Sequence, residues 1–212
     1  MNLLSWNCRG LGTLRAVREV ANMVGEFNPQ VIFLMETKKK RQEMEWLRSR
    51  WRFDKVFTLD GVGRGGGLAL LWLDEARVEV KSYSRYHIEA VVGSGNEDSK
   101  WRLTGFYGDP ETYRRTVSWE MLRRLKSMNN LPWLCVGDFN EVLSNDEKLG
   151  GALRPQRQMH NFKEALADCE LNEIHMGGSK YTWSRGNDMN MIRERLDRGV
   201  ATEGWFHLFP YS

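Results

Sequence analysis

The sequence is poor in cysteine, in long apolar runs and in net charge. Its three cysteines, Cys8, Cys135 and Cys169, lie far apart without CxxC spacing, a pattern typical of reduced thiols in an intracellular protein. Apolar runs such as Val31–Met35 are only as long as a strand, which excludes a membrane-spanning helix. The first residues lead straight into a strand, so no signal peptide is visible. We therefore expect an intracellular protein without a membrane segment.

Basic and acidic residues almost balance, with 31 Lys and Arg against 28 Asp and Glu and a net charge of +3. A total this small argues only weakly for a polyanionic partner. Two local clusters, Lys38–Arg41 and Arg48–Arg52, are basic and have Trp46 or Trp51 nearby. Such clusters are typical either of nucleic-acid contact or of a solvated helix face, and the sequence leaves both interpretations open.

The length of 212 residues and the hydrophobic content of 41% suit one α/β domain, so we predict a single domain over residues 1–212. Apolar residues spaced by three and four predict the helices and their buried faces. The first helix begins at Thr13 and ends at Asn28-Pro29, and the others are Arg41–Ser49, Tyr113–Met128 and Gln156–Asp168. The expected buried stripes are Leu14, Val17, Ala21 and Val24; Val117, Met121, Leu125 and Met128; and Met159, Phe162, Leu166 and Cys169.

Short apolar or alternating runs predict the strands. The continuous run Val31–Met35 fits a buried central strand, and the runs between 53 and 107 predict an antiparallel meander. Strand, helix and strand, then an antiparallel run, then the same again, predict two stacked β-sheets with helices outside. The predicted strands are Asn2–Asn7, Val31–Met35, Phe53–Leu59, Leu68–Trp72, Val78–Tyr83, Ile88–Val92, Trp101–Tyr107, Trp133–Val136, Tyr181–Ser184 and Ile192–Leu196, the last one ending at Asp197.

Several polar residues lie at or just past the ends of these predicted strands. If the strand ends point the same way, the residues converge on one cleft. They are Asn7, Glu36, Tyr107, Asp138, Asn140 and Asp197.

Glu36 and Asn7 have the chemistry of metal ligands. A hard cation such as Mg²⁺ takes oxygen ligands, usually one or two carboxylates, and completes its shell with water and substrate phosphate. Glu36 follows a buried strand and suits that role. The alternatives are that Glu36 is an ordinary strand-end charge and that Asn7 begins the turn at Cys8.

Asp138 and Asn140 flank Phe139 in a Gly-Asp-Phe-Asn turn after a hydrophobic strand. In a phosphodiester site, Asp138 can orient or deprotonate a water and Asn140 can donate to a phosphate oxygen. An Asx turn, in which the two side chains bond their own backbone, explains the same residues equally well.

Five short motifs span nearly the whole chain: Ser5–Gly10, Met35–Thr37, Gly137–Asn140, Tyr181–Trp183 and Arg195–Asp197. In this order they resemble the endonuclease/exonuclease/phosphatase superfamily. Four stretches narrow the resemblance: Trp6–Gly12, Gly65–Ala69, Thr104–Gly108 and Tyr181–Ser184. Within the superfamily they are most similar to the apurinic-like endonuclease domain of plant LINE-type non-LTR retrotransposons.

The resemblance implies a four-layered α/β sandwich that nicks DNA with Mg²⁺ or Mn²⁺, acts as a nuclear monomer and needs no small-molecule cofactor. By motif match, Asn7 and Glu36 hold the metal, Asp138 positions the attacking water and Asn140 the phosphate. The match further implies that Tyr107 contacts the phosphate or assists the site, that Asp197 orients a catalytic histidine, and that Thr182 helps to shape the substrate end of the site. Arg9 is a further candidate for substrate binding, through a phosphate.

One family feature is not found among these residues. Members of the family finish with a strand that carries Ser-Asp-His, in which the histidine stabilises charge on the phosphate. Here the sequence ends at Ser212, and Ser-Asp precedes none of His87, His160, His175 and His207. We expect His207 to lie in an apolar strand after Trp205-Phe206 and to be structural. The sequence therefore predicts a domain truncated at its C-terminus without its last strand, and its alternative function is weak or absent turnover with metal or nucleic-acid binding retained.

Overall fold

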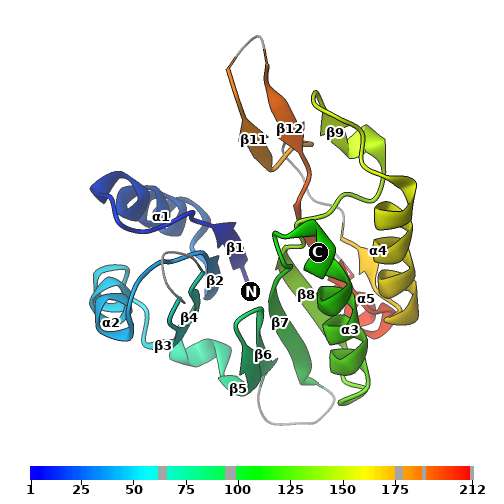
Figure 1. The fold of residues 1–212 in the computed structure, drawn as a ribbon. Helices are drawn as coiled ribbons and strands as arrows, with labels where there is room; N and C mark the ends of the chain where they lie inside the picture. The colour runs from blue at the N-terminus through cyan, green and yellow to red at the C-terminus, as the bar shows by residue number, and fades with distance from the viewer. Residues whose placement is uncertain (62–65, 94–98, 175–178, 188–189, 211–212) are drawn as a thin grey trace. The chain divides into compact units, whose positions relative to one another are not determined.

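A computed structural model describes residues 1–61, 66–93, 99–174, 179–187 and 190–210 (Figure 1). Gly65, the first residue of the Gly65–Ala69 motif, and His175 lie outside these residues. The chain divides into two compact units, Met1–Phe106 and Tyr107–Ser212, and each is described by itself.

A mixed four-stranded sheet forms the centre of the first unit, in the order β1 (Leu3–Asn7), β2 (Val31–Met35), β4 (Leu68–Trp72) and β3 (Lys55–Leu59). β1 and β2 are parallel, and β4 is antiparallel to both of its neighbours. All five residues of β2 are buried, which confirms the predicted central strand. Helices α1 (Leu14–Phe27) and α2 (Arg41–Arg50) follow β1 and β2.

The buried face of α1 differs from the predicted stripe. Thr13 caps the helix by accepting a hydrogen bond from the Ala16 N–H at 3.2 Å. Ala16, Val17 and Val20 are buried, whereas Leu14 is 73% exposed. Including Leu14 in the buried stripe was therefore wrong. On a helix of 3.6 residues per turn, a face centred on positions 16, 17 and 20 turns position 14 to the side.

The predicted meander between 53 and 107 is interrupted. β3 and β4 belong to the four-stranded sheet, and a separate antiparallel meander follows, made of β5 (Val78–Ser84), β6 (His87–Val92) and β7 (Trp101–Tyr107). The short 3₁₀ helix η1 (Asp74–Ala76) separates the two groups. A β-carbon at Gly105 would lie 2.3 Å from the Phe33 ring, so only glycine lets β7 approach β2 this closely.

In the second unit, β8 (Trp133–Asp138) pairs antiparallel with β13 (Asp197–Ala201), which also pairs with β10 (Asn172–Glu173). Helices α3 (Arg115–Lys126), which η3 (Thr112–Arg114) precedes, and α4 (Gln156–Asp168) pack together, with the Trp119 and Phe162 rings stacked at 4.5 Å. A small sheet contains β11 (Trp183–Arg185), β12 (Ile192–Glu194) and β9 (Lys148–Leu149), which η4 (Asn145–Glu147) precedes. Helix α5 (Glu203–Leu208) follows β13.

Three local predictions for this unit were wrong. Only Ile192–Glu194 of the run 192–196 form a strand, β12, and Asp197 begins the next strand, β13, so Asp197 begins a strand and does not end one. His207 lies in α5 and its side chain is 76% exposed, so it is not in an apolar strand. In α3, Val117 and Met128 near it are more than half exposed, because the stacked Trp119 directs the buried face through Ser118, Trp119 and Leu122.

The α/β class, with mixed multi-stranded sheets flanked by helices, is confirmed (Figure 1). The three cysteines are buried and unbridged, as the sequence predicts. Within the described residues, no helix has the length and apolar character needed to cross a bilayer. The single-domain assignment and the missing last strand stay predictions.

Candidate active site

The first unit brings Asn7 and Glu36 together at one edge of its sheet. β1 and β2 are parallel neighbours, so the residues that end them leave from the same edge. Asn7 is the last residue of β1, and Glu36 follows β2 directly. Asn7 Nδ2 donates to Glu36 Oε1 at 3.0 Å, and the Glu36 side chain is 23% exposed. The two predicted metal ligands are therefore neighbours in space.

A cation of the chain itself lies beside this pair. Lys38 Nζ is 3.8 Å from Glu36 Oε2 and donates to the Arg9 carbonyl oxygen at 3.3 Å. The Arg9 N–H in turn donates to Asn7 Oδ1 at 3.1 Å, while Arg9 as a residue is exposed. From the sequence, Lys38 is only one member of a basic cluster. The structure adds it to the surroundings of Glu36.

In the second unit, Asp138 and Asn140 form one hydrogen-bonded turn. The Asn140 N–H donates to Asp138 Oδ1 at 2.8 Å, which is the Asx turn that the sequence left open. Asn140 Nδ2 donates to the Gly108 carbonyl oxygen at 2.9 Å. A carboxylate has two oxygens and an amide nitrogen has two hydrogens, so bonds that orient these groups are compatible with a chemical role.

Asp197 reaches the same edge from the opposite direction. It begins β13 and stands opposite Asp138 in the antiparallel register. Thr182 Oγ1 accepts hydrogen bonds from the Leu196 and Asp197 N–H groups, both at 3.0 Å. Thr182 therefore orients the backbone at Asp197, and its predicted contact with substrate stays a prediction.

Tyr107 is the last residue of β7, and Gly108 follows it. Tyr107 is 8% exposed and is the first residue of the second unit. The Gly108 N–H donates to the Asp138 carbonyl oxygen at 2.8 Å, and a β-carbon at Gly108 would lie 2.3 Å from the Phe139 carbonyl oxygen. Only glycine permits this close approach. The approach positions the Gly108 carbonyl oxygen, which accepts the hydrogen bond from the Asn140 side-chain amide.

Positive φ angles at non-glycine residues occur in the candidate loops as well as at helix ends. Eight described non-glycine residues have positive φ, a conformation that few such residues adopt. Four of them end or follow helices, where a left-handed residue is usual: Asn28, Arg52, Arg77 and Glu170. The other four lie in the loops described above: Arg9, Glu36, Lys38 and Asn140. Such backbone strain clusters at functional sites, so it supports a functional interpretation of these loops.

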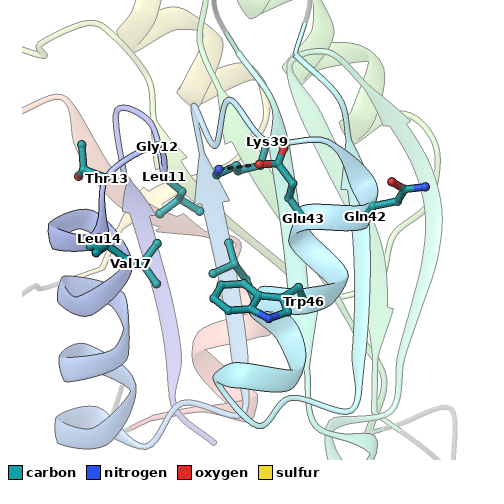
Figure 2. Close-up of a pocket in the computed structure, with 10 residues that line it drawn as sticks. Leu11, Gly12, Thr13, Leu14, Val17, Lys39, Gln42, Glu43 and Trp46 are labelled. Carbon is teal, nitrogen blue, oxygen red and sulfur yellow. Dashed lines mark hydrogen bonds and ion pairs between the residues drawn. The ribbon is translucent and has the colours of Figure 1, made fainter.

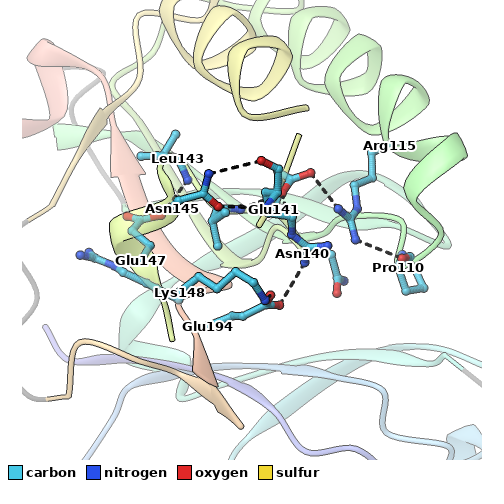
Figure 3. Close-up of polar contacts among 12 residues, drawn as sticks. Pro110, Arg115, Asn140, Glu141, Leu143, Asn145, Glu147, Lys148 and Glu194 are labelled. Carbon is cyan, nitrogen blue, oxygen red and sulfur yellow. Dashed lines mark hydrogen bonds and ion pairs between the residues drawn. The ribbon is translucent and has the colours of Figure 1, made fainter. Parts of the chain in front are cut away.

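Buried charges stand directly behind Asn140 (Figure 3). Glu141 is 1% exposed, and Arg115 Nη1 donates to its Oε2 at 2.7 Å. Arg115 Nη2 also donates to the Pro110 carbonyl oxygen at 3.2 Å. On the other side, Arg154 Nε lies 3.3 Å from Glu141 Oε1, an ion pair by distance without hydrogen-bond geometry. Arg115 thus links Glu141, next to Asn140, to Pro110. Pro110 is two residues after Gly108, whose carbonyl oxygen accepts the bond from the Asn140 amide.

A second buried pair supports the start of β13. Arg198 Nη1 and Nη2 donate to the two oxygens of Glu147 at 3.1 and 2.7 Å, and the Leu143 N–H adds a third bond at 2.7 Å. Burial alone would raise the pKa of Glu147. The hydrogen bonds and charge of Arg198 outweigh burial and hold that pKa below its ordinary value of 4.5. Neither pair is evident from the sequence, because the members of the two pairs are 26 and 51 residues apart.

Cys8 follows Asn7 but is not a nucleophile. Its Sγ donates to the Met35 carbonyl oxygen at 3.0 Å, and burial raises the pKa of the thiol to about 11. The thiol stays protonated at neutral pH, and only a thiolate is a strong nucleophile.

The donor atoms at Asn7 and Glu36 fit a hard divalent cation. Both residues offer oxygen, and the Asn7 carbonyl oxygen has two lone pairs. Within the described residues, no group of three or more His, Cys, Asp and Glu side chains is placed to hold a metal. The residues therefore fit an open site, in which one carboxylate and one amide oxygen leave room for water and phosphate, and not a closed cage.

Family membership follows from the match over both units. The sequence profile of the Endonuclease/Exonuclease/phosphatase family matches residues 4–210. The chain belongs to this family. The superfamily predicted from the five motifs is thereby confirmed, and both polar clusters lie inside the matched region of this endonuclease/exonuclease/phosphatase protein. No curated protein matches it in sequence.

Solved structures of nucleases share the fold. The endonuclease domain of TRAS1, a telomere-specific non-LTR retrotransposon, has 16% identity and a TM-score of 0.65, with 95% of this chain and 84% of that chain covered. An AP endonuclease from Leishmania major has 15% identity and a TM-score of 0.72, with coverage of 94% and 78%. A 3′ phosphatase from Neisseria bound to a product DNA hairpin has 15% identity and a TM-score of 0.67, with coverage of 94% and 86%. These identities establish the family fold alone.

Proposed function

We propose that this protein is a divalent-metal-dependent phosphodiesterase that nicks DNA. The observation that carries the proposal is the pair of polar clusters at strand ends, each with left-handed non-glycine residues. Asn7 and Glu36 suit a cation. Asp138 and Asn140 suit a water and a phosphate. Family membership supports phosphoester chemistry, and the nucleases that share the fold favour nucleic acid.

In the proposed mechanism, the residues divide the work between ion, water and phosphate. Glu36 and Asn7 would hold a Mg²⁺ or Mn²⁺ ion, which would supply positive charge to the phosphate. Asp138 orients the attacking water and accepts its proton as the water oxygen bonds to phosphorus. The P–O bond to the 3′ oxygen breaks, and that oxygen takes a proton from solvent and leaves as a 3′-hydroxyl. The Asn140 amide donates to a phosphate oxygen, where negative charge develops. The two clusters act together only if they face one substrate, and this convergence is part of the proposal.

Four residues complete the proposed site. Tyr107 contacts the phosphate, and the exposed Arg9 contacts the DNA backbone. Thr182 shapes the substrate end through the start of β13. In the family motif the residue matched by Asp197 orients a histidine, and the Ser-Asp-His sequence that would supply it is not among these 212 residues.

A second candidate function for a domain of these 212 residues alone is metal or nucleic-acid binding without efficient turnover. One electrostatic donor to the transition state contributes about 10²–10³ in rate, so such a domain, tested without the histidine, should hydrolyse DNA more slowly by about that factor. His160 and His207 are on exposed helix faces beside Glu164 and Glu203, and partners of His87 include Ser82 and Ser84.

We further propose an origin in a non-LTR retrotransposon. The shared fold of the TRAS1 domain supports this origin, and the motifs quoted above favour the plant LINE group. An endonuclease of this origin acts on chromosomal DNA, so the proposal includes a nuclear location. The proposal also treats the protein as a monomer that needs no partner chain.

Nicking of supercoiled plasmid tests the proposed function. We expect nicking with Mg²⁺ or Mn²⁺ and none with EDTA. Glu36→Gln should weaken Mn²⁺ binding in a titration. Asp138→Asn should leave Mn²⁺ binding unchanged and lower the nicking rate about 10²–10³-fold.

Glu45→Gln is the matched control, because Glu45 is a partly exposed glutamate of the first unit that pairs with Arg48 on α2. It should behave as the parent protein. Nicking by Glu36→Gln at the parent rate would overturn the proposal. Mn²⁺ binding without nicking would favour the second candidate function.

A further inference from the structure

A groove lies between α1 and α2 in the first unit (Figure 2). Its volume is about 430 Å³, within the roughly 300–1,000 Å³ of small-molecule sites. Leu14 and Val17 of α1 line one side, and Trp46 and Leu47 of α2 line the other. Leu14 is 73% and Trp46 is 58% exposed, so two large apolar side chains border an open groove. We call it the α1–α2 groove.

Trp46 is the aromatic surface that this groove offers. Of the two tryptophans in the basic clusters, Trp51 is buried at 4% exposure and Trp46 is not. The Arg50 guanidinium lies 5.4 Å from the Trp46 ring centroid, so a cation accompanies the ring. An exposed aromatic ring with an arginine beside it provides base stacking and phosphate neutralisation together.

Charge around the groove favours a polyanion. Segment 38–52 holds seven basic and two acidic residues, a net charge of +5 in a chain whose total is +3. The lining includes the first turns of both helices, Thr13 and Leu14 of α1 and Gln42 and Glu43 of α2. Helix N-termini carry partial positive charge and favour phosphate. Lys39 Nζ is 2.7 Å from Glu43 Oε1, so a polar pair borders the apolar floor and can bond the edge of a base.

The groove continues from the loops of the candidate site. Leu11 of the lining is four residues after Asn7, and Lys39 is three residues after Glu36. The Leu11 N–H donates to the Thr37 carbonyl oxygen at 3.0 Å, which links the two loops. The two loops that hold Asn7 and Glu36 therefore also contribute to the lining of the groove.

We propose that the α1–α2 groove binds single-stranded DNA by stacking an unpaired base on Trp46, with the adjacent phosphates on the basic residues of segment 38–52. The choice of DNA rests on the proposed function. An open, apolar and basic groove with one exposed ring suits a base that is not paired, because a paired base does not present its face. The groove thus favours DNA that is unpaired next to the nick.

Binding measured in EDTA tests this proposal without any hydrolysis. The probe is a short single-stranded oligonucleotide with 2-aminopurine, read by fluorescence quenching and by anisotropy. Trp46→Ala should raise the Kd for the oligonucleotide roughly tenfold. Trp46→Phe keeps an aromatic ring, so its Kd should stay close to the parent value. Arg50→Gln should reduce the salt dependence of binding by the equivalent of about one phosphate contact.

Tyr113→Ala is the matched control, because Tyr113 is also exposed, at 73%, and has Arg114 5.2 Å from its ring. It should leave the Kd unchanged. Parent-like affinity of Trp46→Ala, with its folding confirmed by an unchanged Tm, would overturn the proposal. An equal loss for a blunt duplex would overturn the unpaired base as occupant. This binding test is independent of hydrolysis. A failure of the plasmid-nicking assay would therefore count against the proposed function and not against the groove.

Discussion

The two units hold their candidate residues in different ways. In the first unit, main-chain bonds hold the loops at Asn7 and Glu36: the Cys8 N–H donates to Met35 and the Thr37 N–H to Gly67. In the second unit, buried ion pairs stand behind the turn at Asn140 and the start of β13. A partly exposed carboxylate such as Glu36 can face a cation from solvent. A turn pressed against a core needs opposite charges, because an unpaired buried charge is costly.

A buried glutamate in each unit, each paired with an arginine, gives a second comparison. Glu89 in β6 receives both of its bonds from Arg102 on one oxygen, Oε1, at 2.8 and 2.7 Å, and its Oε2 is a buried acceptor without a hydrogen bond in the described part of the chain. Glu147 receives bonds on both oxygens from Arg198 and Leu143. Burial raises the pKa of Glu89, whereas the pKa of Glu147 is lowered. The number of donors decides whether burial or charge dominates.

Breaking one buried ion pair in each unit should have the largest effect on stability. Arg115→Met leaves Glu141 without its 2.7 Å partner, and Arg102→Met does the same to Glu89. We expect a loss of about 3–5 kcal/mol in the free energy of unfolding for each, measured by urea denaturation. Under conditions where both variants are folded, only Arg115→Met should also lower nicking, because only Arg115 contacts the loop beside Asn140.

Arg15→Met provides the baseline for this pair. Its partner Glu19 is one helical turn away, and the two side chains are 89% and 45% exposed. The expected change is within about 0.5 kcal/mol. Equal losses from Arg15→Met and Arg115→Met would contradict the contrast between exposed and buried pairs.

Adding one methyl group should have different effects at two loop glycines, one in each unit. At Gly108 a β-carbon would meet the Phe139 carbonyl oxygen at 2.3 Å, whereas at Gly12 nothing lies within 4 Å. Gly108→Ala should cost about 1–3 kcal/mol by overpacking, and Gly12→Ala should leave the unfolding free energy nearly unchanged. Thermal unfolding of the two variants measures the difference, and a Tm of Gly108→Ala equal to that of the parent would refute the close approach.

The pH dependence of stability should show the smallest effect, with opposite signs in the two units. For Glu147, the lowered pKa means that its contribution is present above its ordinary value of 4.5 and is lost as pH falls through the folded-state pKa. For Glu89, the raised pKa means that its contribution is present below 4.5 and is lost as pH rises through the folded-state pKa. Urea denaturation of Glu147→Gln and Glu89→Gln between about pH 3 and 7 gives the free energy of unfolding as a function of pH. Each variant should differ from the parent by on the order of 1 kcal/mol where the replaced carboxyl titrates. Parallel curves for the two variants would contradict the assignment.

Much of the fold could be predicted because it depends on short-range patterns. The run Val31–Met35 is apolar without a break, and it forms the fully buried β2. The stripe through Met159, Phe162 and Leu166 is the buried face of α4. Of the stripe predicted for α3, Leu125 is buried, whereas Val117 and Met128 were wrong. The ring stack of Trp119 on Phe162 joins residues 43 positions apart and is not visible in local spacing.

The candidate site divides in the same way. Asn7, Glu36, Asp138 and Asn140 were identified from their positions after apolar strands, and the structure places them in two hydrogen-bonded clusters. Their catalytic roles stay predictions. Arg115, Glu141 and Lys38 were missed as site neighbours, because nothing in the residues around each one names its partner.

The sequence by itself determined the order and type of most elements, the family, and which polar residues follow strand ends. These depend on side-chain periodicity and on the chemistry of neighbouring residues, which act over a few positions. Only the tertiary structure decided which charges pair, which glycines are crowded and which tryptophan is exposed. Asp197 illustrates the reason: it opens β13 and meets Asp138 across an antiparallel pair, and such a pairing is set by the packing of distant segments.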